Sequence, residues 1–412
     1  MATYTTRLVD RVLAETLAGL PAVMITGPRA CGKTTTARRQ AAQVVRLDRA
    51  GEAFAFLADP DDAVRQTRQP VLLDEWQRVP GVMGAIKRLL DDEDFAPNRF
   101  ILTGSALPVD ATDSWLGTGR VVDLTMGPLG RREIERRVGE RLFVDRLLDG
   151  SLADFAAPYP ATLASYVDWA LQGGFPEVAL AVAPSHRRRW IAGYIERLIA
   201  HDVRDLAGAR DSAALRRYLM ALATNTAGVV PNKTLYEVAD IAASTARSYD
   251  HLLRNLFVLD VVPAWSANRL TRLIDTPKRF LVDPSLVAGL LDLTAASVFA
   301  DGDIMGRLIE TFVLAQLRPE TEVSGNRPRL YHLRDKDDRH EIDIIVEYAG
   351  NRVAALEVKA SAAPKAKDFR HLRWLRDRLG DRFVAGLLLH TGPVPVQVDD
   401  RIVAAPISTI WL

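Results

Sequence analysis

The stretch of this sequence that points most directly to chemistry is GPRACGKTT, which begins at Gly27 directly after an apolar run. It fits the pattern G-x-x-x-x-G-K-[ST], whose glycines let backbone N–H groups fold around phosphate oxygens without a clashing Cβ atom. The N-terminus of the following helix, expected over 34–43, adds the positive end of a dipole. We expect Lys33 to bridge the β- and γ-phosphates of ATP and the Thr34 hydroxyl to complete the coordination shell of Mg²⁺. The expected nucleotide-binding residues are Gly27, Pro28, Arg29, Ala30, Cys31, Gly32, Lys33, Thr34 and Thr35.

Two further strand ends carry polar residues of the kind that complete an ATP site. In VLLDEWQ, three apolar residues deliver Asp74 and Glu75 to the C-terminal end of a predicted strand, the edge where a doubly wound sheet places its ligand. Asp74 is expected to hold the water shell of Mg²⁺, and Glu75 to polarise the attacking water as a catalytic residue. In FILTGS the polar tip 103–105 includes Ser105, at the place expected of a group that senses the γ-phosphate. The sequence therefore predicts a Mg²⁺-dependent ATP hydrolase.

Two residues near these motifs have both a chemical and a structural interpretation. Arg120, in GTGR, is a candidate arginine finger for catalysis, and a structural salt bridge is an equal alternative. Cys31 occupies a position that the phosphate-loop pattern leaves free. A thiol at a helix N-terminus can be redox-sensitive, but a small filler side chain is the favoured interpretation.

A second group of chemical residues lies near the C-terminus, in EIDIIVEYAGNRVAALEVKAS. Because side chains alternate along a strand, Asp343 has apolar neighbours on the opposite face, and Glu357 and Lys359 share one face of the next strand. An Asp on one strand and E-x-K on its hairpin partner match the PD-(D/E)xK arrangement of metal-dependent nucleases, in which oxygen ligands hold Mg²⁺ beside a cation. Glu310 is a lone carboxylate in an apolar helix, and its burial would need a partner or a metal.

The candidate nuclease-like set is therefore Glu310, Asp343, Glu357 and Lys359. It departs from the pattern in one place, because Glu341 and an isoleucine, rather than a proline, precede the aspartate. A lone E-V-K in a strand is also common on a solvated edge. The intact order of the four parts favours a restriction-endonuclease-like fold, while DNA cleavage is a separate hypothesis, because a fold does not imply its chemistry.

The arrangement of apolar segments predicts an α/β chain of four parts. Short apolar runs alternate with helical patterns from about residue 20 to 130, which is typical of parallel strands buried on both faces. Later, three helices and a strand pair near 258–264 and 278–283 form the pattern of a winged helix, whose third helix opens with a cap signal at 244–245. The expected parts are a P-loop ATPase domain over 1–138, a helical lid or bridge over 139–210, a winged-helix domain over 211–299 and a restriction-endonuclease-like α/β domain over 300–412.

Composition limits the classes of protein to consider. The 412 residues carry a formal net charge of +1, so a global electrostatic footprint for nucleic acid is excluded and any such site must be a local patch. The single cysteine excludes an intrachain disulfide and suits a reducing cytoplasm. The N-terminus lacks an apolar signal-peptide segment, and no apolar run approaches the ~20 residues that a membrane span needs. We expect a cytoplasmic protein with no membrane partner.

Basic residues gather in local clusters that are candidate DNA contacts. A helix predicted over 366–379 has an apolar face, so its basic side chains should project outward. Charge runs are usually solvated faces, but these clusters, a winged helix and a nuclease-like fold together favour binding to the phosphate backbone of DNA. We expect recognition of DNA structure rather than of base sequence. The candidate DNA contacts are Arg247, Lys365, Lys367, Arg370 and Arg373.

The motifs GPRACGKTT, LLDEWQRVP, ILTGSA, GGFPE and YIERLIAHDVRDLA resemble those of the prokaryotic AAA-type ATPases that carry a C-terminal domain of unknown function. The resemblance covers nearly the whole chain. It implies an AAA-like ATPase core, a winged-helix segment and a nuclease-like C-terminal fold. It leaves the biological substrate open.

Three functions follow as hypotheses. The first is a DNA-dependent ATPase, with ATP and Mg²⁺ as cofactors, that acts in DNA transactions such as repair or replication on forked or branched structures. The second is an ATP-gated, metal-dependent nuclease. The third is a signalling NTPase whose C-terminal domain binds a protein partner. Metal-dependent nicking of DNA would separate the second from the first, and an ATPase indifferent to every nucleic acid would favour the third.

Overall fold

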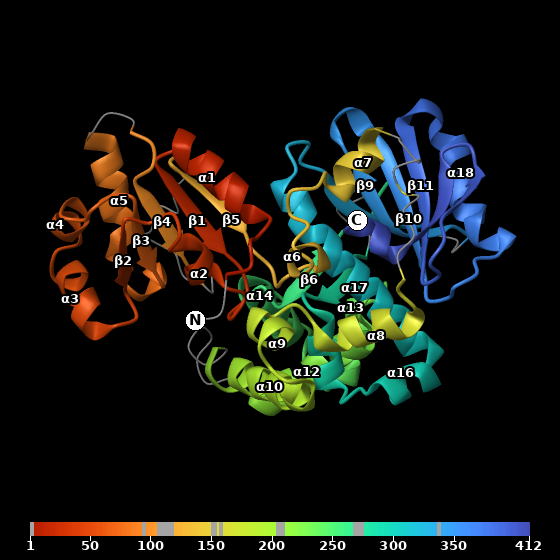
Figure 1. The fold of residues 1–412 in the computed structure, drawn as a ribbon. Coiled ribbons are helices and arrows are strands. Elements are labelled where there is room, and N and C mark those ends of the chain that lie inside the picture. Colours follow the sequence, from red (N-terminus) through yellow and green to blue (C-terminus); the bar gives the residue numbers. More distant parts are fainter. Residues whose placement is uncertain are drawn as a thin grey trace. The chain divides into compact units, whose positions relative to one another are not determined.

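The structure is a computed structural model that describes residues 4–92, 96–104, 119–149, 155, 160–202, 211–266, 276–335 and 339–412 (Figure 1). Ser105, a predicted catalytic residue, lies outside these described residues. The chain divides into two compact units. The first comprises Met1–Pro128 with Leu252–Val258, and the second comprises Leu129–His251 with Leu259–Leu412.

The first unit is built on a five-stranded sheet in which every neighbouring pair of strands is parallel. The strand order is β2-β3-β4-β1-β5, so β1 lies between β4 and β5. β1, β3 and β4 are buried along their whole length, as their continuous apolar sequences predict for strands covered on both faces. The parallel α/β sheet expected from the sequence is confirmed. The strands are β1 (Ala22–Thr26), β2 (Gln43–Arg46), β3 (Val71–Asp74), β4 (Phe100–Thr103) and β5 (Val121–Thr125).

Helices between these strands complete the apolar core of the first unit. Trp76 and Ile86 are fully buried in this core with Leu73 and Leu102. The helix after the phosphate loop ends at Ala37, earlier than the expected 34–43, because the N–H groups of Arg39 and Gln40 donate to carbonyls only three residues back. The helices are α1 (Val9–Gly19), α2 (Lys33–Ala37), α3 (Ala50–Ala58), α4 (Pro60–Arg65), the 3-10 turn η1 (Trp76–Arg78) and α5 (Gly81–Asp92).

The second unit begins with helices that pack on its C-terminal part. Arg132, in α6, donates from Nε to Glu320 Oε1 at 2.8 Å and from Nη2 to the carbonyl oxygen of Ile410 at 2.8 Å. Both ends of this ion pair are buried. The expected domain boundary at residue 138 therefore falls inside the second unit. These helices are α6 (Arg131–Ile134), α7 (Phe143–Asp149), α8 (Leu163–Gln172), α9 (Pro176–Leu180), α10 (Pro184–Arg197) and the π-helical turn η3 (Leu198–Asp202).

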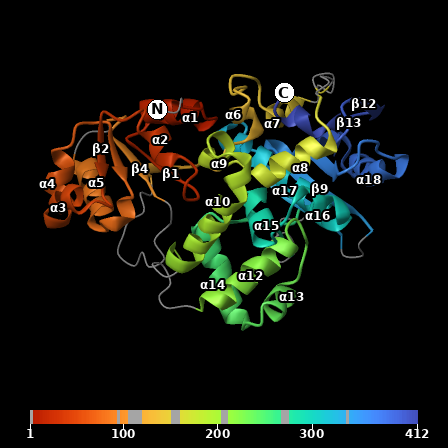
Figure 2. The same cartoon turned by 60° about the horizontal axis from the view of Figure 1, so that its bottom comes forward.

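Three helices and an antiparallel ribbon follow in the order expected from the sequence. The ribbon pairs Leu259 with Leu281 and Val262 with Lys278. The third helix starts before the predicted cap at 244–245, because the N–H of Ala246 already donates to the carbonyl of Ala242. Figure 2 displays these helices. The elements are α12 (Ser212–Thr224), α13 (Asn232–Val238), α14 (Ala243–Asn255), β6 (Leu259–Val262), β7 (Lys278–Leu281), α15 (Pro284–Leu290) and α16 (Ala295–Ala300).

The last part of the second unit is a six-stranded mixed sheet in the order β12-β13-β11-β10-β9-β8. The β9-β10 hairpin is antiparallel, and β10 and β11 are parallel. α17 packs on β10, while α18 packs on β9, β10 and β11 through Leu372 and Leu375. The expected mixed α/β section is thus present. Its elements are α17 (Gly302–Val323), β8 (Arg329–Arg334), β9 (Glu341–Glu347), η5 (Ala349–Asn351), β10 (Val353–Lys359), η6 (Ala366–Phe369), α18 (Arg370–Leu379), η7 (Gly380–Arg382), β11 (Phe383–His390), β12 (Val396–Asp399), β13 (Ile402–Pro406) and η8 (Ile407–Ile410).

Candidate functional site

The phosphate loop adopts a backbone that its glycines make possible. Gly27 has φ of 144°, and a Cβ atom at this position would lie 2.0 Å from the carbonyl oxygen of Met126. Gly32 has φ of 98° and immediately precedes α2. Both values lie in the region that favours glycine. The loop therefore turns tightly from the end of β1 into a helix N-terminus.

Lys33 is buried inside this loop. Its Nζ donates to the carbonyl oxygens of Gly27 and Pro28, each at 2.8 Å. Both acceptors are neutral, and an ammonium is attracted more strongly to an ionised acceptor, because opposite charges then face each other. Phosphate oxygens entering the loop can therefore replace these carbonyls as partners of the ammonium.

Asp74 lies where the phosphate loop, β3 and β4 meet. Its Oδ1 accepts from Thr34 Oγ1 at 2.8 Å and from Thr103 Oγ1 at 2.5 Å. The parallel register places Asp74 and Thr103 side by side at the carboxyl ends of their strands. A carboxylate and a hydroxyl are hard oxygen ligands of the kind that Mg²⁺ takes together with water and substrate phosphates. Thr34 and Asp74 therefore fit the metal role predicted for them.

Glu75 follows directly and has a left-handed backbone conformation, with φ of 55° and ψ of 47°. Such a conformation costs a non-glycine residue on the order of 1 kcal/mol and tends to cluster at functional sites. Its Oε2 accepts from Gln77 Nε2 at 2.5 Å. The side chain lines the cavity in front of the phosphate loop, as a residue that polarises water must.

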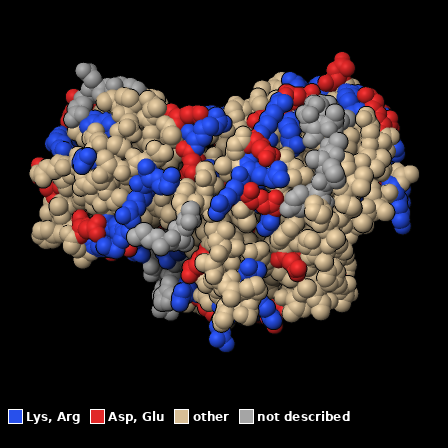
Figure 3. Space-filling model, viewed as in Figure 1, with Lys and Arg blue, Asp and Glu red and all other residues tan. Residues whose placement is uncertain are grey.

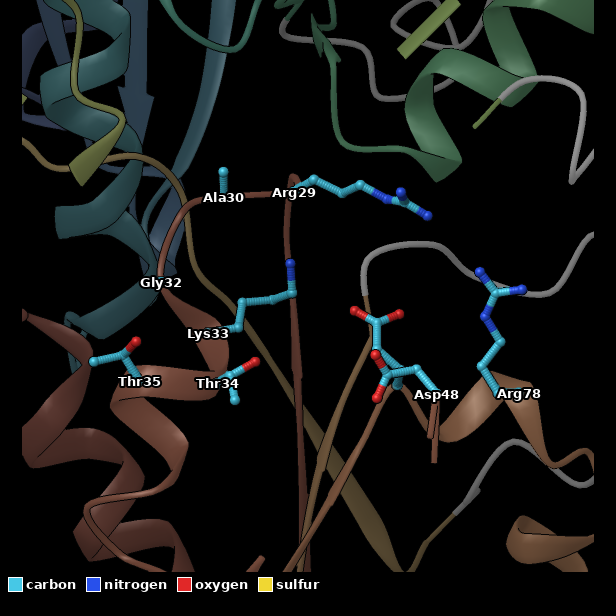
Figure 4. Close-up of a pocket in the computed structure, with 9 residues that line it drawn as sticks. Arg29, Ala30, Gly32, Lys33, Thr34, Thr35, Asp48 and Arg78 are labelled. Atoms are coloured by element: carbon cyan, nitrogen blue, oxygen red, sulfur yellow. The ribbon is translucent and has the colours of Figure 1, made fainter. Parts of the chain in front are cut away.

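This cavity has a volume of about 390 Å³ (Figure 4). Two of its residues, Asp48 and Arg78, have no role in the sequence interpretation. Figure 4 draws them across the cavity from Thr34. Asp48 could have been noticed because it follows β2, at the same sheet edge as the other strand-end carboxylates. The cavity is lined by Arg29, Ala30, Gly32, Lys33, Thr34, Thr35, Asp48, Glu75 and Arg78.

A second cluster of charged residues lies in the second unit, around a lysine that the sequence interpretation missed. Lys278, from β7, donates from Nζ to Glu310 Oε1 at 2.8 Å and to Asp343 Oδ1 at 3.3 Å. Its Nζ also lies 3.9 Å from Glu341 Oε1. The structure thus brings two members of the predicted nuclease-like set together, with an ammonium between them.

The other two members of that set pair with each other. Lys359 Nζ lies 3.4 Å from Glu357 Oε2, and Oε1 of the buried Glu357 has no hydrogen-bond partner among the described residues. Burial, followed by the nearby Asp343 carboxylate, raises the pKa of Glu357 well above its usual range. Within the described part of the chain, no group of three His, Cys, Asp or Glu side chains is arranged to hold a metal ion.

The comparisons with known proteins agree with the first site. A family profile described as AAA domain matches residues 20–135. Profiles described as Domain of unknown function (DUF8612) and Domain of unknown function (DUF4143) match residues 163–297 and 305–410. The first unit carries an AAA-type P-loop ATPase domain.

Two similar sequences and two similar solved structures complete these comparisons. Uncharacterized proteins of Mycobacterium bovis and Mycobacterium tuberculosis are each 28% identical to this chain, over 97% of its length and 82% of theirs. A Walker-type ATPase of Pyrococcus abyssi covers 68% of this chain and 94% of its own at 14% identity, with a TM-score of 0.41. AMPPCP-bound DnaA from Aquifex aeolicus covers 62% and 88% at 14% identity, with a TM-score of 0.29. These structural similarities are too low to support an inference.

Arg120 lies far from the ATP cavity of its own chain. It precedes β5, whose first residue Val121 pairs with Ala22 at the start of β1, whereas the phosphate loop follows the other end of β1. Its Nη2 lies 3.2 Å from Asp91 Oδ1. The structural salt bridge is therefore the role observed, and a catalytic role in this ATP site is wrong because the residue stands at the opposite edge of the sheet.

Cys31 is fully buried within the ATPase domain. Its Sγ donates to the carbonyl oxygen of Met126 at 3.2 Å. A thiol without solvent access is a poor redox sensor, because oxidation requires an exposed thiolate. The geometry favours the interpretation of Cys31 as a small filler side chain.

The candidate DNA contacts differ in how far their charges are compensated. Arg373 Nε pairs with Asp399 Oδ2 at 3.0 Å, and Arg370 Nε donates to the ring of His371. Lys365, Lys367 and Arg370 are exposed, as is Arg247 on α14. On the face drawn in Figure 3, basic and acidic side chains are interspersed. No helix within the described ranges is long and apolar enough to cross a membrane.

Proposed function

We propose that this protein is a Mg²⁺-dependent ATP hydrolase whose turnover is coupled to DNA binding by its second unit. The observation that carries the ATPase part is the convergence of Lys33, Thr34 and Glu75 at one cavity, with Asp74 hydrogen-bonded to Thr34. Each of these side chains has the chemical type that its place in phosphoryl transfer requires.

The division of roles follows from the contacts. Lys33 would exchange its two carbonyl acceptors for phosphate oxygens, because the charged acceptors bind an ammonium more strongly. Thr34 and Asp74 would hold Mg²⁺, which would neutralise charge on the phosphates. Thr103 keeps the Asp74 carboxylate in place through its hydroxyl. Glu75 would orient and polarise a water molecule for attack on the γ-phosphorus.

The DNA part of the proposal rests on exposed basic residues of the second unit. Lys365, Lys367 and Arg370 are exposed along the η6 turn and the first residue of α18, where side chains can follow a phosphate backbone. Arg247 is exposed on α14, the third helix of the segment that precedes the ribbon. Contacts of this kind bind the backbone and carry little information about base sequence.

The experiment is ATP hydrolysis by the purified chain with Mg²⁺ and a panel of DNAs: none, single strand, blunt duplex, fork and four-way junction. Stimulation by one DNA structure, with a rate that falls as salt rises, would support the proposal and identify the ligand. The triple variant Lys365→Glu, Lys367→Glu, Arg370→Glu should lose that stimulation. Lys233→Glu, at an exposed position on α13, is the matched control.

A response that is flat across the panel would contradict the DNA part of the proposal. ATP hydrolysis without any DNA effect would instead favour the signalling NTPase with a protein partner. One observation points to that alternative: Arg188, Arg216 and Arg373 already form ion pairs within the chain, so part of the basic charge is compensated.

A further inference from the structure

The carboxylate cluster of the second unit already contains a cation, supplied by the chain itself. The side chain of Lys278 is only 2% exposed, and its Nζ faces Glu310, Asp343 and Glu341 at 2.8, 3.3 and 3.9 Å. Burial opposes the charge, but the carboxylates of Glu310 and Asp343 raise the pKa of Lys278 above its usual range. The ammonium therefore remains protonated where the carboxylates converge.

The metal implied by the PD-(D/E)xK pattern does not fit this arrangement. Mg²⁺ requires oxygen ligands at about 2.0–2.1 Å in near-octahedral geometry. Of the two oxygens of Asp343, Oδ1 accepts from the ammonium and Oδ2 accepts from the backbone N–H of Val358 at 2.9 Å. A divalent ion between Glu310 and Asp343 would have to displace the lysine or lie against a like charge.

Glu357 does not compensate for this loss. Its side chain is 4% exposed, its Oε2 faces Lys359, and burial raises the pKa of its carboxyl group. The carboxyl group of Glu357 thus already has a cationic partner within the fold. Glu357 and Lys359 of the E-x-K part are therefore paired with each other beside the cluster.

The lysine comes from a different part of the chain than the carboxylates it joins. Lys278 belongs to β7 and pairs across the ribbon with Val262, whereas Glu310 lies on α17 and Asp343 on β9. Lys278, Glu310 and Asp343 line one cavity of about 400 Å³. The β6-β7 ribbon thus places the Lys278 ammonium next to α17 and β9 of the C-terminal part.

We propose that the Lys278 ammonium takes the place of a divalent cation in this carboxylate cluster. The C-terminal part then retains the nuclease-like arrangement of side chains, but neither binds a metal ion there nor cleaves nucleic acid. The proposal is independent of the ATPase function, because it concerns a different set of residues in a different unit.

The test measures Mn²⁺ binding by the electron paramagnetic resonance signal of the free ion, without nucleotide. Every protein carries Asp74→Asn, so that the ATP site does not contribute. The parent should show no Mn²⁺ binding that depends on Asp343. Lys278→Gln should gain Asp343-dependent Mn²⁺ binding, at least roughly tenfold tighter than any residual binding by the parent, because a neutral side chain then faces the carboxylates. Adding Asp343→Asn to Lys278→Gln should abolish this gain in Mn²⁺ binding. The control Lys233→Gln should produce no gain in Mn²⁺ binding.

Two results would overturn the proposal. The first is Mn²⁺ binding or DNA nicking by the parent chain that disappears in Asp343→Asn. The second is a folded Lys278→Gln protein that gains no Mn²⁺ binding. If Lys278→Gln does not fold, the double variant Lys278→Gln, Glu310→Gln removes one charge of each sign. This protein should still gain Asp343-dependent binding, and its failure to do so would equally contradict the proposal.

Discussion

The two charged clusters of this protein contain the same residue types and use them differently. In the phosphate loop, Lys33 is held by two neutral carbonyl oxygens, while the nearby Asp74 is held by two hydroxyls. In the second unit, Lys278 is held directly by the carboxylates of Glu310 and Asp343. The first lysine keeps its charge available for an incoming anion. The charge of the second is already neutralised within the fold.

The difference teaches that a lysine near acidic residues is informative only once its acceptors are known. An ammonium held by neutral dipoles can exchange them for a ligand with a gain in electrostatic energy. An ammonium held by carboxylates cannot leave them without a large cost, because the negative charge then stays buried without a partner. Substitution of Lys33 should therefore reduce activity more than stability. Substitution of Lys278 should reduce stability more than activity.

The largest effect is expected for Lys33→Ala. ATP hydrolysis should fall by at least roughly 100-fold, because the phosphates lose the cation that stabilises their charge during transfer. The measurement is phosphate release under saturating Mg²⁺ and ATP. Lys87→Ala, which removes an exposed lysine of α5 in the same unit, is the control and should hydrolyse ATP normally. Full activity in Lys33→Ala would refute the site.

Glu75→Gln should separate nucleotide binding from turnover. The amide keeps the size of the side chain but cannot act as a base, so hydrolysis should fall roughly 100- to 1,000-fold. Equilibrium binding of ATP should change little, because the phosphate loop is intact. A fluorescent ATP analogue measures the affinity and phosphate release measures the rate. Equal losses in binding and rate would indicate a structural role for Glu75.

Lys278→Met should affect stability more than any catalytic rate. Removal of the lysine leaves Glu310 and Asp343 buried without their counter-charge, which typically costs about 3–5 kcal/mol. Urea unfolding followed by tryptophan fluorescence measures the loss. Lys233→Met, at an exposed pair with Glu237, should change the free energy of unfolding by less than about 1 kcal/mol. Equal stability of the two variants would contradict the description of the second cluster.

The pH dependence of stability should report His332, which lies beside the second cluster. Burial and the nearby Lys278 and Arg334 lower the pKa of this imidazole to about 4, while Asp343 opposes them. Its Nε2 donates to the carbonyl of Thr276 at 3.1 Å, and its Nδ1 has no partner among the described residues. The folded protein therefore keeps the ring neutral, and protonation opposes the fold.

The sign of the effect follows from that lowered pKa. Stability that depends on neutral His332 is present above pH 6.5 and is lost as pH falls toward about 4, because the unfolded chain binds the proton more readily. The expected loss is about 2–3 kcal/mol. Urea unfolding of the parent and of His332→Asn across this range measures it. The variant should lose less stability, and parallel curves would contradict the assignment.

The smallest effect is expected for Arg120→Ala. The residue forms a partly exposed pair with Asp91, so the free energy of unfolding should change by less than about 1 kcal/mol. ATP hydrolysis should remain at the parent level. Phosphate release and thermal unfolding test both statements. A large loss of hydrolysis would instead mean that Arg120 reaches the ATP site of another copy of the chain.

The ATP site could be predicted from sequence because its chemistry is local. The phosphate loop spans consecutive residues, and Asp74 is positioned by the apolar strand directly before it. The parallel sheet was predictable for the same reason, since its strands are continuous apolar runs. The place of Arg120 could also be predicted from sequence. The residue precedes a parallel strand, so it must lie at the edge of the sheet opposite the phosphate loop.

The second cluster could not be predicted in full, because its decisive residue is distant in sequence. Lys278 stands 32 residues from Glu310 and 65 from Asp343, on a strand whose own pattern carries no chemical signal. Sequence order correctly brought together Glu310 and Asp343. It could not reveal that a lysine from the preceding ribbon enters between them, since that depends on tertiary packing.

The anchoring of α6 has a consequence for the order in which the protein is made. Arg132 donates to the carbonyl of Ile410, and Arg146 donates to that of Thr409. A nascent chain can form the five-stranded sheet of the ATPase domain soon after β5 has emerged from the ribosome, because all of its strands have then been translated. Helices α6 and α7 cannot form these contacts until residues 409 and 410, near the end of the chain, have been translated. During synthesis the second unit therefore remains incomplete for longer than the ATPase sheet. We expect its early helices to depend most on a chaperone, because they lack their packing partners in that time.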